Sequence, residues 1–247
     1  RVHEIKDMDE LKRRLGEDRR FFSYFHPALE DEPIIFVQVA LTNGLGKSIQ
    51  EITKPRTEGD KKYDSATFYS ISNCQEGLSR VTLGNFLIKR VVFEIQEELP
   101  NIKNFGTLSP IPGFRDWFSY LEDSKIKNIL GNISLENISF LKSPDLKPGD
   151  PRILSNKDAL LKLVAHYLMN EKNNKKLPIN DVCRFHLGNG AIIDDIIINA
   201  NVSEVGLNRS FGVMVNYLYE LKNIEKNHED YINNKKIIVS DKVKKLI

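Results

Sequence analysis

The chain has 247 residues, of which 40% are hydrophobic and 28% charged, a composition that is typical of a folded globular protein and excludes general disorder. Its formal net charge of +2 is too close to zero to predict nucleic acid as the main partner. No apolar run reaches the roughly eighteen residues that a membrane span needs, so none is expected.

The cysteines and the opening residues bear on the compartment. Cys74 and Cys183 are the two cysteines, which are too few for a disulfide framework and favour a reducing compartment. The opening residues are charged and lack the apolar segment of a signal peptide. We therefore expect an intracellular protein, with cytoplasm, mitochondrion and peroxisome all open.

Predicted strands and helices alternate in the first part of the chain. Continuous apolar runs indicate strands buried on both faces, and apolar residues at helical spacing indicate amphipathic helices. Asn85 is the expected N-cap of the central helix, which Pro100 ends. The expected elements are a charged helix at 7–19, a strand at Pro33–Leu41, an exposed loop at Glu51–Asp64, a strand at Ser65–Ser72, a helix at Phe86–Leu99 and a strand at 101–108.

The second part is predicted to be richer in helix. An interrupted helical stretch is followed by a strong amphipathic helix with a Ser-x-x-Asp start, then by a glycine turn between a short helix and a strand. The expected elements are a broken helix at 112–132, a helix at Ser155–Lys172, a short helix, turn and strand at 179–203, a strand at 211–221 and a helical end at 227–247. Because no linker demands a boundary, we expect one mixed α/β or α+β sheet domain over residues 1–247.

The stretch "NFGTLSPIPGF" at 104–114 ends a strand abruptly and leaves a hydroxyl, Ser109, at its end. In one interpretation Ser109 is an ordinary turn residue and the prolines only end the strand. In the other, Pro110, Pro112 and Gly113 fix a short loop so that the hydroxyl points at a ligand. The prolines are expected to keep this loop from pairing back into a sheet.

The stretch "TNGLGKS" at 42–48 resembles a phosphate-binding P-loop only in its end. That motif needs a glycine five residues before Gly46, and Leu41 occupies the position. A polar turn around Asn43 and Gly44 is the better interpretation.

Two further glycine-containing stretches are candidate site elements. The loop "QEGLSRVTLGN" at 75–85 leads from a strand into a helix, so it predicts either a backbone anion site at the helix N-terminus or a simple turn. In "FHLGNGA" at 185–191, His186 lies beside a glycine turn, where a backbone can approach a ligand closely. A structural role for His186 stays open, and the other histidines carry little signal.

Together these stretches bring a resemblance to a family. The strings "FYSIS", "QEGL", "LGNFLIKRVV", "LSPIPGF", "FHLGNGA" and "GVMVNYLY" resemble the C-terminal catalytic domain of the malonyl-CoA decarboxylase family, in order and at about its spacing. The resemblance covers nearly the whole chain. It implies a GNAT-like fold, in which a splayed central β-sheet flanked by helices binds acyl-CoA. It also implies that the family's helical N-terminal domain lies upstream of Arg1.

The resemblance also implies roles for individual residues. Ser109 falls on the family's catalytic serine and His186 on its catalytic histidine, while Tyr219 falls on a tyrosine near the acyl group. The loop that binds the CoA pyrophosphate would contain the remaining site residues, which are Gly77, Thr82, Gly84 and Asn85. Thr82 departs from relatives that carry glutamate there, which puts full activity in doubt.

The implied reaction is decarboxylation of malonyl-CoA to acetyl-CoA and CO2. The thioester accepts the electrons, so no metal or cofactor is expected. Two alternatives stay open, a CoA-binding module without catalysis and an acyltransferase on the same fold. Expected partners are malonyl-CoA and acetyl-CoA, with neither nucleic acid nor membrane. Because the family's helical domain is the natural assembly element, a homo-oligomer is a further expectation for the full-length protein.

Overall fold

The computed structural model describes residues 8–27, 29, 32–54, 62–74 and 84–247. The contacts between residues divide the chain into two compact units. The first comprises Arg1–Leu108 with Leu218–Glu220, and the second comprises Ser109–Tyr217 with Leu221–Ile247.

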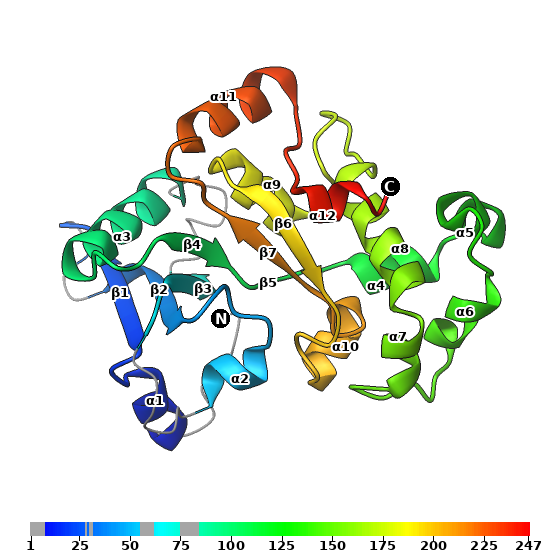
Figure 1. Ribbon diagram of the computed structural model, residues 1–247, viewed down its shortest axis with the longest axis horizontal. Coiled ribbons are helices and arrows are strands. Elements are labelled where there is room, and N and C mark those ends of the chain that lie inside the picture. Colours follow the sequence, from blue (N-terminus) through cyan, green and yellow to red (C-terminus); the bar gives the residue numbers. More distant parts are fainter. Residues whose placement is uncertain (1–7, 28, 30–31, 55–61, 75–83) are drawn as a thin grey trace. The chain divides into compact units, whose positions relative to one another are not determined.

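The first unit is built on four strands in the order β1-β2-β3-β4. The first three pair antiparallel, and β3 and β4 are parallel because α3 crosses between them. The blue to green part of Figure 1 contains these elements. Their bounds are α1 (Met8–Arg14), β1 (Arg19–Phe25), β2 (Pro33–Thr42), α2 (Ile49–Thr53), β3 (Ser65–Asn73), α3 (Gly84–Glu98) and β4 (Asn104–Thr107).

The core of the first unit confirms the pattern expected of its central elements. The predicted helical stripe of α3 is buried, as its residues Ile88, Val91, Val92 and Ile95 are at most 4% exposed. In the middle of β2, successive residues from Val39 to Leu41 are all buried, as a strand covered on both faces requires. A later segment, Leu218–Glu220, completes the unit, since Leu218 pairs with Gly106 of β4.

The second unit carries the remaining strands and most of the helices. Strand β7 pairs antiparallel with β5 and also pairs with β6. The strands are β5 (Ser109–Pro110), β6 (Ile192–Ile197) and β7 (Met214–Leu218), the last ending in the first unit. The helices are α4 (Phe114–Ser119), α5 (Asp123–Leu130), α6 (Glu136–Ser139), η2 (Phe140–Lys142), α7 (Pro151–Ser155), α8 (Lys157–Met169), α9 (Asp181–Gly188), α10 (Glu204–Ser210), α11 (Ile224–Asn234) and α12 (Asp241–Lys244).

Several predicted boundaries are wrong, each for a local reason. The charged helix expected at 7–19 ends at Arg14, and the next residues turn into β1, which pairs with β2. The loop expected at Glu51–Asp64 begins inside a helix, α2, which Ser48 caps. The helix expected to start at Ser155 begins at Lys157, since the Ser155 hydroxyl donates to the Pro151 carbonyl and closes α7 instead.

The loop after Ser109 also corrects an expectation. Ser109 and Pro110 pair with Val215 and Met214 as the short strand β5, although the prolines were expected to keep the loop out of a sheet. Proline has no N–H to donate but keeps its carbonyl, and an edge strand tolerates the missing donor. The hydroxyl of Ser109 is therefore held by strand pairing as well as by proline.

Candidate active site

Ser109 and His186 meet inside the second unit. The Ser109 Oγ atom lies 3.0 Å from His186 Nε2, although the two residues are 77 positions apart in the chain. Both are buried, with 6% and 3% of their surface exposed. The pairing with β7 fixes the backbone of Ser109, and helix α9 carries His186 in its last turn. The two residues that the sequence singled out thus form one hydrogen-bonded pair.

The end of α9 is fixed by a close approach of α11. Gly190 has φ +80°, and a Cβ atom on it would lie 2.2 Å from the carbonyl oxygen of Ile224. The Gly190 carbonyl accepts a hydrogen bond from Asn227 Nδ2 at 3.2 Å, and His228 Nδ1 lies 2.6 Å from the Gly188 carbonyl. The glycine turn of "FHLGNGA" therefore serves close packing of the helix that carries His186.

Burial controls the charge of His186. Desolvation lowers its pKa to about 3, well below the ordinary value of 6.5, so the imidazole is neutral at neutral pH. Its ring stacks on Tyr217 with centroids 4.5 Å apart and packs edge-on against Phe185 at 5.0 Å. A neutral imidazole can accept the hydroxyl proton of Ser109 or donate its own, according to the tautomer.

Tyr219 lies in the first unit. Its backbone N–H donates to the Phe105 carbonyl at 2.8 Å, and its ring packs edge-on against Phe68 at 6.5 Å. The side chain is 2% exposed, and burial raises the pKa of its phenol well above 10. The phenol therefore keeps its proton at neutral pH. The expected role of Tyr219 at the acyl group stays a prediction.

The predicted CoA loop lies mostly outside the described residues. Gly77 and Thr82 are not among them. The described residues resume at Gly84, the first residue of α3. Asn85 is inside this helix, so the helix begins before the residue that was expected to cap it. The loop does lead into a helix N-terminus, and its role as an anion site remains a prediction.

The P-loop-like stretch is a polar turn, as predicted. The Gly44 N–H donates to Asp64 Oδ1 at 2.7 Å, and the Gly46 N–H donates to Thr67 Oγ1 at 2.9 Å. Gly44 has φ +68°, which suits a turn. These backbone donors are satisfied by protein oxygens.

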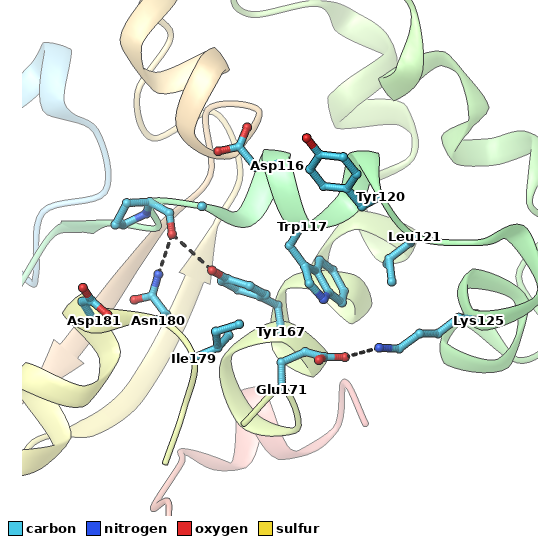
Figure 2. A pocket seen from close by; sticks show the side chains of 12 residues that line it. Asp116, Trp117, Tyr120, Leu121, Lys125, Tyr167, Glu171, Ile179, Asn180 and Asp181 are labelled. Atoms are coloured by element: carbon cyan, nitrogen blue, oxygen red, sulfur yellow. Dashed lines mark hydrogen bonds and ion pairs between the residues drawn. The ribbon is translucent and has the colours of Figure 1, made fainter. Parts of the chain in front are cut away.

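A pocket of about 670 Å³ opens beside the loop that follows Ser109 (Figure 2). Pro112 and Gly113 line it, but Ser109 and His186 do not. Its charged lining residues are Asp116, Lys125, Glu171 and Asp181, with Lys125 Nζ 2.7 Å from Glu171. Three carboxylates against one lysine do not suit the phosphates of CoA, so we do not assign the substrate to this pocket.

The described part of the chain contains neither a metal-binding cluster nor a membrane-spanning helix. No three histidine, cysteine, aspartate or glutamate side chains there are grouped so that they could hold a metal ion. Among the same residues, no helix is long and apolar enough to cross a bilayer. Cys74 and Cys183 are not joined in a disulfide.

Sequence reasoning missed two residues that contact the pair or the elements that carry it. Asn180 caps α9, and Tyr217 stacks on His186. An asparagine directly before the Asp-Val-Cys start of a predicted helix is a recognisable cap signal. No comparable signal existed for Tyr217, because its place depends on the pairing of β7 with β5, which the sequence alone does not reveal.

Comparison with known proteins gives the family context. The sequence model of the malonyl-CoA decarboxylase C-terminal domain matches residues 1–247. A mitochondrial malonyl-CoA decarboxylase of Anser anser anser is 38% identical over 265 residues, covering 98% of this chain and 52% of the relative. The crystal structure of malonyl-CoA decarboxylase from Rhodopseudomonas palustris has a TM-score of 0.89 and 40% identity, and the match covers 100% of this chain and 57% of that one. The chain spans about half the length of these relatives.

A more distant likeness confirms the predicted fold class. The loading GNATL domain of CurA from Lyngbya majuscula matches with a TM-score of 0.53 and 14% identity, covering 90% of this chain and 85% of that domain. At this identity the likeness concerns the fold alone. The mixed α and β architecture is thus GNAT-like.

Proposed function

Because the chain belongs to the malonyl-CoA decarboxylase family, we propose that the protein decarboxylates malonyl-CoA to acetyl-CoA and CO2. The observation that carries the proposal is the buried contact of 3.0 Å between Ser109 Oγ and His186 Nε2. These are the two residues to which the family resemblance assigns catalysis.

The reaction requires the protein to position the substrate, to stabilise the enolate and to supply one proton. When the bond between the carboxylate and the α-carbon breaks, its electron pair moves into the thioester carbonyl as an enolate, and CO2 leaves. A donor held toward the enolate oxygen typically contributes about 10²–10³ in rate, and a general acid about 10²–10⁴. We assign the first role to Ser109, toward the carboxylate or the enolate, and the proton to His186.

The low pKa of His186 constrains how it acquires that proton. At pH 7 the imidazole is neutral, because desolvation disfavours the cation. A malonyl carboxylate beside the ring would favour the cation instead, since an opposite charge stabilises it. The substrate would therefore raise the pKa of His186 on binding. Once CO2 has left, the proton moves to the α-carbon and the ring becomes neutral again.

The remaining site residues complete the proposal. We infer that the stretch containing Gly77, Thr82, Gly84 and Asn85, whose last two residues begin α3, receives the CoA pyrophosphate through backbone amides. Tyr219, protonated at neutral pH because burial raises its pKa, would approach the acyl group as a hydrogen-bond donor. Cys74 and Cys183 are not joined in a disulfide, which suits a reducing intracellular compartment.

A direct experiment is to supply the protein with malonyl-CoA and follow acetyl-CoA and CO2 by mass spectrometry. The proposal predicts stoichiometric formation of both. Binding of malonyl-CoA without turnover would favour a CoA-binding module. Acyl transfer from acetyl-CoA to added amines, without decarboxylation, would favour an acyltransferase.

A further inference from the structure

Asn180 connects the loop that follows Ser109 with the helix that carries His186. It directly precedes α9, the helix that carries His186, and it is 2% exposed. A buried amide must satisfy both its oxygen and its nitrogen, since leaving either unpaired costs free energy. The hydrogen-bond partners of Oδ1 and Nδ2 therefore show which segments the side chain connects.

The two ends of the Asn180 amide bind different segments. Oδ1 accepts from the Cys183 N–H at 2.8 Å and caps α9, while Nδ2 donates to the Pro112 carbonyl at 2.8 Å. Figure 2 shows the second bond, together with the Tyr167 hydroxyl that donates to the same carbonyl at 3.2 Å. Pro112 is three residues after Ser109. The same side chain thus grips the serine loop and the start of the histidine helix.

These contacts form a closed series of connections that includes Ser109 and His186. From Ser109 the chain runs to Pro112, whose carbonyl binds Asn180. Helix α9 then leads to His186, whose Nε2 returns to Ser109 Oγ at 3.0 Å. Because a short helix transmits position rigidly, the Asn180 amide sets the distance between the loop and the helix. We propose that Asn180 is a positioning residue for the Ser109–His186 pair, an inference that rests on the proposed function.

The chemistry of the two bonds requires asparagine. An aspartate would cap α9 as well as asparagine does, but it would turn a carboxylate oxygen toward the Pro112 carbonyl. A serine would also cap the helix, but its side chain is too short to hold the loop as well. Both replacements therefore keep the cap and remove the bond to the loop, one with an added charge and one without.

The test compares Asn180→Asp and Asn180→Ser with the parent protein in malonyl-CoA turnover. Misplacement of reacting groups by about 1 Å can cost on the order of 10²-fold in rate, so we expect kcat to fall at least about tenfold in each variant. KM should change less than about threefold, because the CoA body binds elsewhere. Tyr167→Phe removes the second donor to Pro112 and the interaction of its hydroxyl with Asn180, but keeps the Asn180 bond to the loop, so it should lower kcat by a smaller factor.

Ser240 offers a matched control in the same unit. Its hydroxyl accepts from the Val243 N–H at 3.3 Å, capping α12, and donates to the Asp194 carbonyl at 2.5 Å. It thus makes the same two kinds of bond as Asn180 at a place that holds neither Ser109 nor His186. Ser240→Ala should lower the melting temperature and leave kcat of the folded protein unchanged.

The double variant separates positioning from general loosening. In a Ser109→Ala background the hydroxyl that Asn180 aligns with His186 is gone, so adding Asn180→Ser should lower the residual turnover less than about twofold. Full turnover in well-folded Asn180→Asp and Asn180→Ser would overturn the inference, as would an equal loss with and without Ser109. If Ser109→Ala itself retained full turnover, the proposed function of the pair would fail first, whatever Asn180 does.

Discussion

The Ser109 hydroxyl lies 3.0 Å from the Nε2 atom of a histidine, His186, that is buried to 3% exposure and neutral at physiological pH. Burial makes this contact tight, because it excludes water that would compete for both partners. It also makes the contact sensitive to acid, because the imidazole cannot be protonated there without a large desolvation penalty.

Acid should therefore destabilise the fold through His186. Between pH 6.5 and about 3, the unfolded chain binds a proton at this residue that the folded chain does not. The free energy of unfolding then falls as the pH falls, by up to about 1.4 kcal/mol per pH unit. This pH dependence fades above about pH 7, where His186 is neutral in the folded and in the unfolded chain.

Chemical denaturation of the parent and of His186→Gln between pH 5 and 8 would measure this effect. The two curves of unfolding free energy should run parallel above about pH 7. Below pH 6.5 the parent should lose stability faster than the variant. Equal slopes across the whole range would show that His186 is not buried as a neutral ring.

The glycine turn after His186 should tolerate no side chain. In Gly190→Ala the new Cβ would meet the Ile224 carbonyl at 2.2 Å, in addition to the strain of φ +80°. The positive φ alone costs about 1–2 kcal/mol, and overpacking adds about 1–3 kcal/mol. Gly44→Ala is the matched control, since φ is +68° there and nothing lies within 4 Å of the added Cβ.

Thermal melts of the two alanine variants would separate the two costs. Gly190→Ala should melt well below Gly44→Ala, and the difference between them should report the clash with Ile224. Similar melting temperatures would mean that α11 does not approach the turn closely.

The sequence identified the residues of the candidate site but did not predict how they come together. Ser109 and His186 stood out because they lie in specific strings that resemble one family. Their contact depends on strand pairing between β5 and β7 and on the packing of α9, which are long-range and leave no local signal. The prediction that the prolines keep this loop out of a sheet was wrong for the same reason. Pro110 pairs with Met214 of β7, and no local pattern reveals that partner strand.

Elements with a strong period were predicted well, and short or edge elements were not. Strand β2 and helix α3 have continuous or regularly spaced apolar residues, and both were expected within a few residues of their bounds. Strand β1 follows a charged helix without alternation in its burial, and its aromatic residues were not read as a strand. Helix α10 is only seven residues long, and its Ser203 cap was overlooked.

The predicted CoA loop can be tested by substitution at its end. In Gly84→Val the added side chain should obstruct the approach of the pyrophosphate to the backbone, so we expect CoA affinity to fall more than about tenfold. Calorimetric titration with CoA measures this, and a thermal melt checks the fold. An unchanged affinity in the folded variant would remove the loop from the binding site.

Removal of metals should leave the reaction intact. The thioester carbonyl accepts the electrons released with CO2, so the chemistry requires no Lewis acid or carbanion-stabilising cofactor. Turnover after dialysis against EDTA should equal turnover before it. Complete loss that one divalent ion restores would contradict this account of the chemistry.

The most direct test of the central claim is malonyl-CoA turnover by Ser109→Ala, His186→Ala and the double variant, with thermal melts on the same preparations. If the pair acts as one unit in the transition state, each single variant should lose at least about a hundredfold in kcat. The double variant should then fall well short of the product of the two losses, with acetyl-CoA affinity little changed. Lower melting temperatures with near-normal turnover in the folded protein would contradict the account, because they would make Ser109 and His186 structural residues.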